Sequence, residues 1–256
     1  MAPLPLDPAG ASLSPELIHP ALWRAHQLGR ERSGVLPSGF DHLDAELPGG
    51  GWPKRVLTEL LLPHPGVGDI RLLAPALAVV AQGACAGQAA DAGARSVMLF
   101  DPPAMPCAWA LSELGVDDRR LIVVHGREGP RGAALRHLLS SADLLWALEQ
   151  ALRSGHVGAV VAWLSDRLRG EALRRLQLAA QAHDGPVFLV RGIEARIKPS
   201  PAPLRLALHP AGPDGLSVHL LKRRGPAALR PVVLALTPVA GAERVPQAEP
   251  AAVLAH

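Results

Sequence analysis

The chain has 256 residues, 48% of them hydrophobic, and a formal net charge of +3. This length and apolar content suffice for one large domain with a buried core. The small positive charge is compatible with nucleic-acid binding but does not by itself indicate it. The two cysteines lie outside any Cys-x-x-Cys or Cys/His spacing, so the sequence gives no sign of a zinc or redox centre.

The two ends of the chain differ in composition from its middle. Residues 1–19 are rich in Pro, Leu and Ala and are expected to be disordered, residues 20–237 to form the folded domain, and residues 238–256 a flexible tail. The first residues lack the charged and continuously apolar regions of a signal peptide. The longest apolar run, about residues 72–81, is too short to span a bilayer. We therefore expect a cytoplasmic protein with no membrane partner.

The pattern of apolar runs predicts alternating strands and helices. A short helix is expected over 20–30 and another around Phe40 and Leu43, before the glycine-rich turn at 49–51. Short apolar runs predict buried strands at 55–62, 96–100, 121–124, 157–164 and 187–190. Helices are expected at 70–82, 107–114, 141–153 and 168–182. This alternation predicts an α/β fold with a mostly parallel sheet. Strands at 204–208, 216–222 and 232–236, without helices between them, predict an antiparallel C-terminal edge.

The segment from Arg55 to Ile70 has the outline of a phosphate-binding loop without its chemistry. In a working loop the last Gly precedes a Lys that reaches the phosphates and a Ser or Thr that holds Mg²⁺. Here Gly68 is followed by Asp69 and Ile70, and the first Gly of the pattern is replaced by Pro63, which has no N–H to offer. Gly66 and Gly68 still open a helix whose dipole attracts anions. Because Asp69 takes up that field, we expect a structural helix start and no nucleotide or metal cofactor.

Several blocks together resemble the RecA-type recombinase core over roughly residues 36–236. They include 36–53, which resembles the entry to the first core strand, the strand containing Glu59, and the helix and strand at 147–163. The resemblance implies a P-loop-type core whose working residues are replaced. The carboxylate that supports the metal corresponds to Trp163, the catalytic base to Pro103, and the Asn-Gln nucleotide sensor to Arg191-Gly192. It thus implies a degenerate fold that is not an ATPase.

A narrower set of blocks is similar to the ImuA family, which shares ancestry with SulA. These blocks are Trp23-Arg24, 36–53, 58–61, 101–103, 173–180, 199–206 and 221–225. The resemblance implies a role in damage-induced (SOS) translesion DNA synthesis and mutagenesis. Its implied partners are an ImuB-type, Y-family-like polymerase scaffold, an alternative replicative-type DNA polymerase, and RecA or DNA itself. Two alternatives stay open: a SulA-like inhibitor of the tubulin-like division protein, and an NTPase with unusual ligands.

Two groups of residues are the expected contact sites. Lys222, Arg223 and Arg224 end a predicted strand and could bind phosphate or an acidic partner, although a charge run is more often a solvated end. Trp23 and Arg24 lie on the predicted N-terminal helix, and Trp and Arg are common binding hot spots. Packing of Trp23 against its own domain is the equally weighted alternative.

Overall fold

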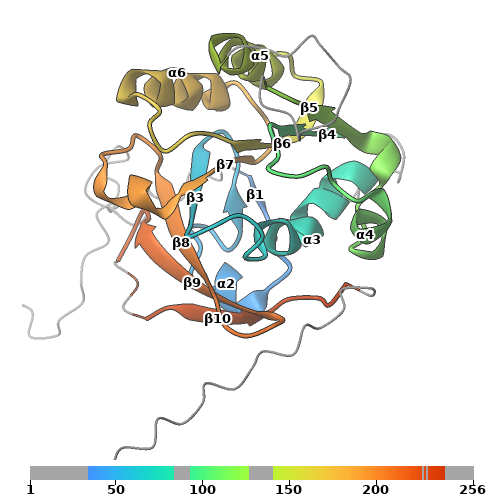
Figure 1. Ribbon diagram of the computed structural model, residues 1–256, viewed down its shortest axis with the longest axis vertical. Coiled ribbons are helices and arrows are strands. Elements are labelled where there is room, and N and C mark those ends of the chain that lie inside the picture. Colours follow the sequence, from blue (N-terminus) through green and yellow to red (C-terminus); the bar gives the residue numbers. More distant parts are fainter. Residues whose placement is uncertain (1–33, 84–92, 127–140, 227, 229, 240–256) are drawn as a thin grey trace, which may run out of the picture. The chain divides into compact units, whose positions relative to one another are not determined.

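The computed structural model describes residues 34–83, 93–126, 141–226, 228 and 230–239 (Figure 1). The strands are β1 (Val35–Leu36), β2 (Trp52–Pro53), β3 (Leu57–Leu62), β4 (Ser96–Phe100), β5 (Leu121–Val124), β6 (Val157–Trp163), β7 (Val187–Gly192), β8 (Leu204–Pro210), β9 (Gly215–Lys222) and β10 (Val232–Ala235). The helices are α2 (Asp41–Asp44), α3 (Asp69–Gln82), α4 (Ala108–Glu113), α5 (Ser141–Arg153) and α6 (Gly170–Gln181), with 3-10 turns η2 (Asp118–Arg120) and η3 (Ile193–Ile197).

Within these residues, eight strands form one sheet in the order β10-β9-β8-β3-β7-β6-β4-β5, and β1 pairs with β2 in a separate antiparallel ribbon. The strands from β8 to β5 are mutually parallel. The two remaining pairings, β8 with β9 and β9 with β10, are antiparallel. The predicted α/β class with a mostly parallel sheet is confirmed, and each predicted core element lies within two residues of an observed one.

The direction of β8 differs from the prediction. The sequence predicts that 204–208 begins an antiparallel edge, whereas β8 pairs in parallel with the central strand β3, and the antiparallel edge begins with β9. After β7 the chain passes through η3 and residues 198–203. It thereby returns to the end of the sheet at which β7 begins, and there it enters β8. This short connection contains no α-helix, so the usual signature of a parallel crossover is missing.

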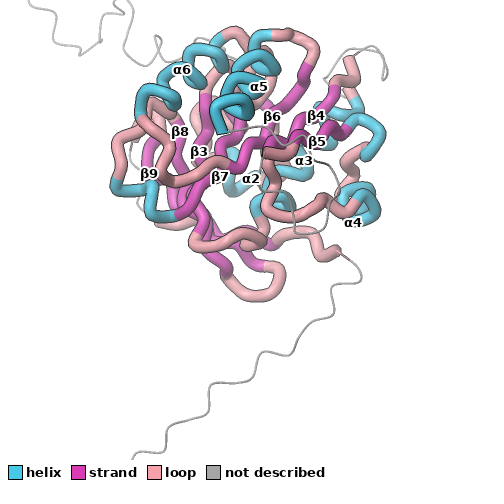
Figure 2. Tube along the Cα trace, turned by 45° about the horizontal axis from the view of Figure 1, so that its top comes forward, coloured by secondary structure: helices cyan, strands magenta, loops and turns pink. Residues whose placement is uncertain are grey.

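Helices cover both faces of the sheet, as Figure 2 shows, with α5 and α6 on one face and α2 and α3 on the other. The alternation of side chains along β3 divides its residues between the two cores. Leu60 and Leu62 pack with α3, and Leu57 packs with α5 and α6. Strands buried on both faces have continuous apolar sequences, which is why this run is readable from the sequence. In the α3 core, the Trp52 and Phe188 rings meet edge to face at 5.2 Å.

The boundaries and packing of α3 depend on glycines. Gly83 ends the helix in the left-handed conformation, and its N–H donates to the carbonyl oxygens of Val79 and Val80. Within the helix, Pro75 approaches Gly39 so closely that a Cβ at position 39 would lie 2.4 Å from the proline Cβ. Gly39 also has a φ of +86°, so any other residue there would be strained twice.

Among the described residues, no helix has the length and apolar character needed to cross a membrane. The predicted helix at 20–30, the N-terminal segment 1–19 and nearly all of the C-terminal segment 238–256 lie outside the described residues.

We expect the stability of the fold to fall in mild acid because of His183. Burial lowers the pKa of this completely buried histidine from 6.5 to about 4; Asp184 opposes the shift and Arg95 adds to it. The unfolded chain therefore binds a proton between pH 6.5 and 4 that the folded chain does not. The free energy of unfolding should decrease across this window by up to about 3 kcal/mol. Denaturant unfolding at several pH values should show this decrease, and His183→Gln should remove it. An NMR titration of the ring with a midpoint at or above 6.5 would contradict the expectation.

Candidate functional site

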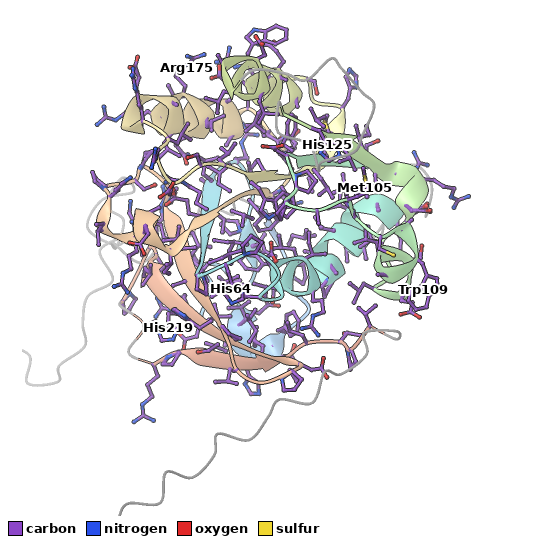
Figure 3. The ribbon with its side chains drawn as sticks, in the orientation of Figure 1. His64, Met105, Trp109, His125, Arg175 and His219 are labelled. Atoms are coloured by element: carbon purple, nitrogen blue, oxygen red, sulfur yellow. The ribbon has the colours of Figure 1, made fainter. Side chains whose placement is uncertain are left out.

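The loop between β3 and α3 has the backbone of an anion-binding helix start. Gly66 and Gly68 have φ angles of +84° and +110°, which favour glycine. Gly68 is the last residue before α3, and its carbonyl oxygen accepts the N–H of Leu72 at 2.8 Å. Asp69 is the first residue of the helix. Gly66 and Gly68 thus open a helix as the sequence predicts. Figure 3 labels His64, which lies in this loop.

The carboxylate of Asp69 lies inside this helix start and not in solvent. Asp69 is buried, and its Oδ2 accepts the indole N–H of Trp163, from the end of β6, at 3.0 Å. Burial raises the pKa of Asp69. The hydrogen bond from Trp163 and those from the backbone N–H groups of Asp69 and Ile70 oppose this rise. The indole N–H of Trp163 is thus the side-chain donor to this buried carboxylate.

The Asp69 carboxylate makes this helix start unattractive to a second anion. Free N–H groups and the helix dipole make such a terminus attractive to phosphate. Here the carboxylate of Asp69, the first residue of the helix, places a negative side chain at the same point. An incoming phosphate would have to displace that carboxylate from Trp163. Trp163 itself is half-buried, and its indole N–H has this polar role.

The C-terminal end of β10 closes over the same loop. Leu236 is buried, and its Cδ1 lies 2.6 Å from where a Cβ on Gly68 would stand. One turn into α3, Arg71 donates to the carboxylate of Asp214 at 2.9 Å. The backbone N–H of Leu236 in turn donates to the carbonyl oxygen of Asp214 at 2.7 Å. The last strand that the structure describes, β10, is thus fastened to the start of α3.

At the ends of β4 and β5, Asp101 serves the backbone. It has a φ of +51°, its N–H donates to the Val124 carbonyl oxygen at 2.7 Å, and its Oδ1 accepts the N–H of Gly126 at 3.0 Å. The next residue, Pro102, is buried and Pro103 is exposed. Neither proline carries a group that could accept a proton, and Asp101 is occupied in joining two strand ends.

A buried ion triad lies at the centre of the sheet, on its α6 face. Glu59 in β3 is fully buried and accepts from Arg191 in β7 at 2.8 Å and from Arg205 in β8 at 2.5 Å. Both guanidinium groups are also buried. The sequence resemblance singles out Glu59 and Arg191 separately, but it gives no indication that they pair. A charged residue within each of three apolar strands is the signal that could have found the triad.

The guanidinium groups of the triad also hold the loops above it. Arg191 donates to the carbonyl oxygen of Asp166 at 2.9 Å, after β6. Arg205 donates to the carbonyl oxygens of Ala195 at 2.8 Å and Lys198 at 3.3 Å, in and after η3. Since each guanidinium presents five N–H donors, one arginine can join a carboxylate and a loop at once.

The structure separates the three predicted basic contact residues. Lys222 is exposed, and its Nζ donates to the carbonyl oxygen of Ser200 at 2.9 Å. Arg223 is mostly buried and forms an ion pair with Glu46 at 2.7 Å, so it ties the segment after β9 to the region of α2. Arg224 is exposed. Lys222 and Arg224 remain available to a partner, whereas Arg223 has a structural contact.

The tryptophans that the structure describes differ in exposure. Trp109 on α4 is 56% exposed and Trp146 on α5 is 62% exposed. Figure 3 shows Trp109 on the outer side of α4, with Met105 in the segment before that helix. Residues 103–109 contain no charged side chain. The predicted contact residues Trp23 and Arg24 lie outside the described residues.

Within the described part of the chain, no group of three or more His, Cys, Asp or Glu side chains could hold a metal ion. No protein-family model matches the sequence, and no curated protein matches it either.

We expect Asp69→Asn to raise the free energy of unfolding at neutral pH. The folded-state pKa of Asp69 is raised, so its ionised form costs stability above that pKa, and the cost fades as the pH falls through it. Asn keeps an oxygen that can accept the Trp163 N–H. The gain should therefore shrink as the pH is lowered in denaturant unfolding. Trp163→Phe, which leaves the carboxylate without its indole donor, should instead cost about 1–3 kcal/mol. An Asp69→Asn protein that is less stable at neutral pH would contradict this account.

Glu59→Gln should destabilise the fold severely, by about 3–5 kcal/mol, because it leaves two buried guanidinium groups without a counter-charge. Asp184→Asn is the matched control, since it breaks the exposed Arg55–Asp184 pair, and should cost no more than about 1 kcal/mol. Chemical denaturation monitored by tryptophan fluorescence measures both. Similar losses in the two variants would show that the triad adds no more than a surface pair.

Proposed function

We propose that this protein is a non-catalytic, RecA-like accessory factor of damage-induced translesion DNA synthesis, similar to the ImuA family, and that it acts by binding a Y-family-like polymerase scaffold. The observation that carries the non-catalytic part is the hydrogen bond between Trp163 and Asp69. In a P-loop-type core these positions would hold the metal-supporting carboxylate and the phosphate-binding lysine. The protein has instead an indole and a carboxylate, which bind each other.

The other positions that nucleotide hydrolysis would require also hold residues unsuited to that chemistry. Phosphoryl transfer depends on positioned cations and a group that orients the attacking water. Ile70 offers no metal ligand, and Pro103 offers no base. Arg191, at the position of the nucleotide sensor, is occupied by Glu59 and by loop carbonyl groups. Four losses, three of them at residues held by internal contacts (Asp69, Trp163 and Arg191), favour a fold retained for binding.

Exposed side chains favour an interaction module. The uncharged segment 103–109 presents Met105 and Trp109, which are 61% and 56% exposed. Apolar side chains of this size that gather on a surface mark interaction sites. Trp and Arg are frequent hot spots, so Trp109 and Arg224 join Trp23 and Arg24 as candidate contacts. The identity of the partner, an ImuB-type scaffold with an alternative replicative-type polymerase, comes from the sequence resemblance.

Co-purification from DNA-damaged cells tests this function. Tagged parental protein should retain the ImuB-type scaffold, as quantified by mass spectrometry. Trp23→Ala, Trp109→Ala and Arg224→Ala should each reduce the amount retained, and damage-induced mutagenesis should fall in parallel. Trp146→Ala is the matched control because it removes an equally exposed tryptophan from a different helix. Capture of the tubulin-like division protein, with arrested septation, would replace this function by a SulA-like one. Capture of neither would overturn it.

Nucleotide binding gives an independent test. Titration calorimetry of the parental protein with Mg²⁺-ATP should show no binding at micromolar concentrations, and no ATP hydrolysis should be measurable. The reason is that Asp69 occupies the helix start and Leu236 packs over Gly68. Micromolar affinity, or a hydrolysis rate that Asp69→Ala changes, would show that the loop still works as a nucleotide site.

A further inference from the structure

Five residues around η3 form a continuous exposed surface, here called the η3 surface: Arg167, Arg196, Ile197, Lys198 and Lys222. Hydrogen bonds and strand pairing bring them together. The Nζ of Lys198 donates to the carbonyl oxygen of Asp166, next to Arg167, at 3.0 Å. Lys222 is the cross-strand partner of Arg205, whose guanidinium binds the carbonyl oxygens of Arg196 and Lys198. In Figure 1, η3 is the short orange helix between α6 and β8.

The positive charge of the η3 surface is not neutralised within the described part of the chain. Lys198 and Lys222 donate to backbone carbonyl groups, and none of the four cations pairs with a carboxylate there. Two acids lie close by, namely Glu194, exposed on the same turn, and Asp166, the chain neighbour of Arg167, so the four cations still outnumber them. The triad beneath the surface adds two guanidinium groups against the single carboxylate of Glu59. The local field therefore favours an anionic partner.

An apolar side chain lies among these cations. Ile197 is 78% exposed, which is the largest exposure among the large apolar side chains that the structure describes. Its backbone is held firmly, because Arg205 donates to the carbonyl oxygens on both sides of it. A fixed, exposed isoleucine flanked by Arg196 and Lys198 offers a contact that a simple polyanion would not use.

We propose that the η3 surface binds an acidic protein segment that places an apolar side chain against Ile197. The cations would pair with its Asp and Glu residues, and burial of Ile197 would supply the non-directional part of the affinity. Single-stranded nucleic acid fits less well, because single strands are held by stacking on aromatic side chains and none of the five residues is aromatic. The inference does not depend on the proposed function, since a partner of any role could present such a segment.

Selection from a random peptide display library tests the proposal with the full chain as bait. The selected peptides should be enriched in Asp and Glu around an apolar residue. Measured by fluorescence anisotropy, they should lose at least tenfold in affinity with Lys198→Glu and with Ile197→Ser. Arg174→Glu reverses an exposed charge on α6, and Val233→Ser removes an exposed apolar side chain on β10, so both serve as matched controls and should bind as the parent does.

Three results would overturn the proposal: selected peptides without acidic enrichment, peptides that bind Lys198→Glu as tightly as the parent, or labelled single- or double-stranded DNA that binds more tightly than the peptides and depends on Lys198. Circular dichroism of each variant confirms that it is folded, and the exposure of these side chains makes loss of the fold unexpected. If the scaffold still co-purifies with Lys198→Glu, the proposed function stands and this surface serves another partner. If the parental protein selects no peptide, the η3 proposal is wrong; if it retains no scaffold, the proposed function is wrong.

Discussion

The pairing of Glu59 with Arg191 and Arg205 is the constraint on which the middle of this protein depends. The three residues come from β3, β7 and β8, which are adjacent in the sheet. A charge removed from water is tolerated only when it is paired and hydrogen-bonded. The strand order and the paths of the loops at 165–168 and 193–198 are therefore coupled, because moving any of them would leave a buried charge without its partner. Arg205 also binds the carbonyl oxygens of Arg196 and Lys198, so it holds the backbone from which these two exposed basic side chains extend.

The helix start at Asp69 shows a second kind of coupling. Asp69 and Trp163 are far apart in the chain, but the Trp163 indole donates a hydrogen bond to the Asp69 carboxylate. This contact joins the end of β6 to the start of α3 and places a negative side chain at a glycine-rich helix start. The charge at the positive end of the α3 dipole is thus the carboxylate of Asp69, a side chain of the protein itself.

Local patterns in the sequence predicted much of the fold, because a strand buried on both faces and an amphipathic helix each have their own periodicity. The start of α3 after Gly68 and the burial of β3 follow from such patterns. The parallel direction of β8 did not, since a strand's sequence does not encode the direction of its neighbour. The partners of Glu59 and Asp69 were missed for a related reason: a residue's own position is visible in the sequence, but its contacts arise only when distant strands come together.

The packing of Leu236 against Gly68 has a consequence for the order of events during synthesis. A ribosome releases the chain from the N-terminus, so β3, the glycine loop and α3 emerge long before the residue that covers them. Until then the loop is open to water on that side, and Arg71 lacks its partner Asp214. The nascent domain must therefore wait for Leu236 before this corner can close, and a message truncated upstream of β10 yields a protein with an open loop.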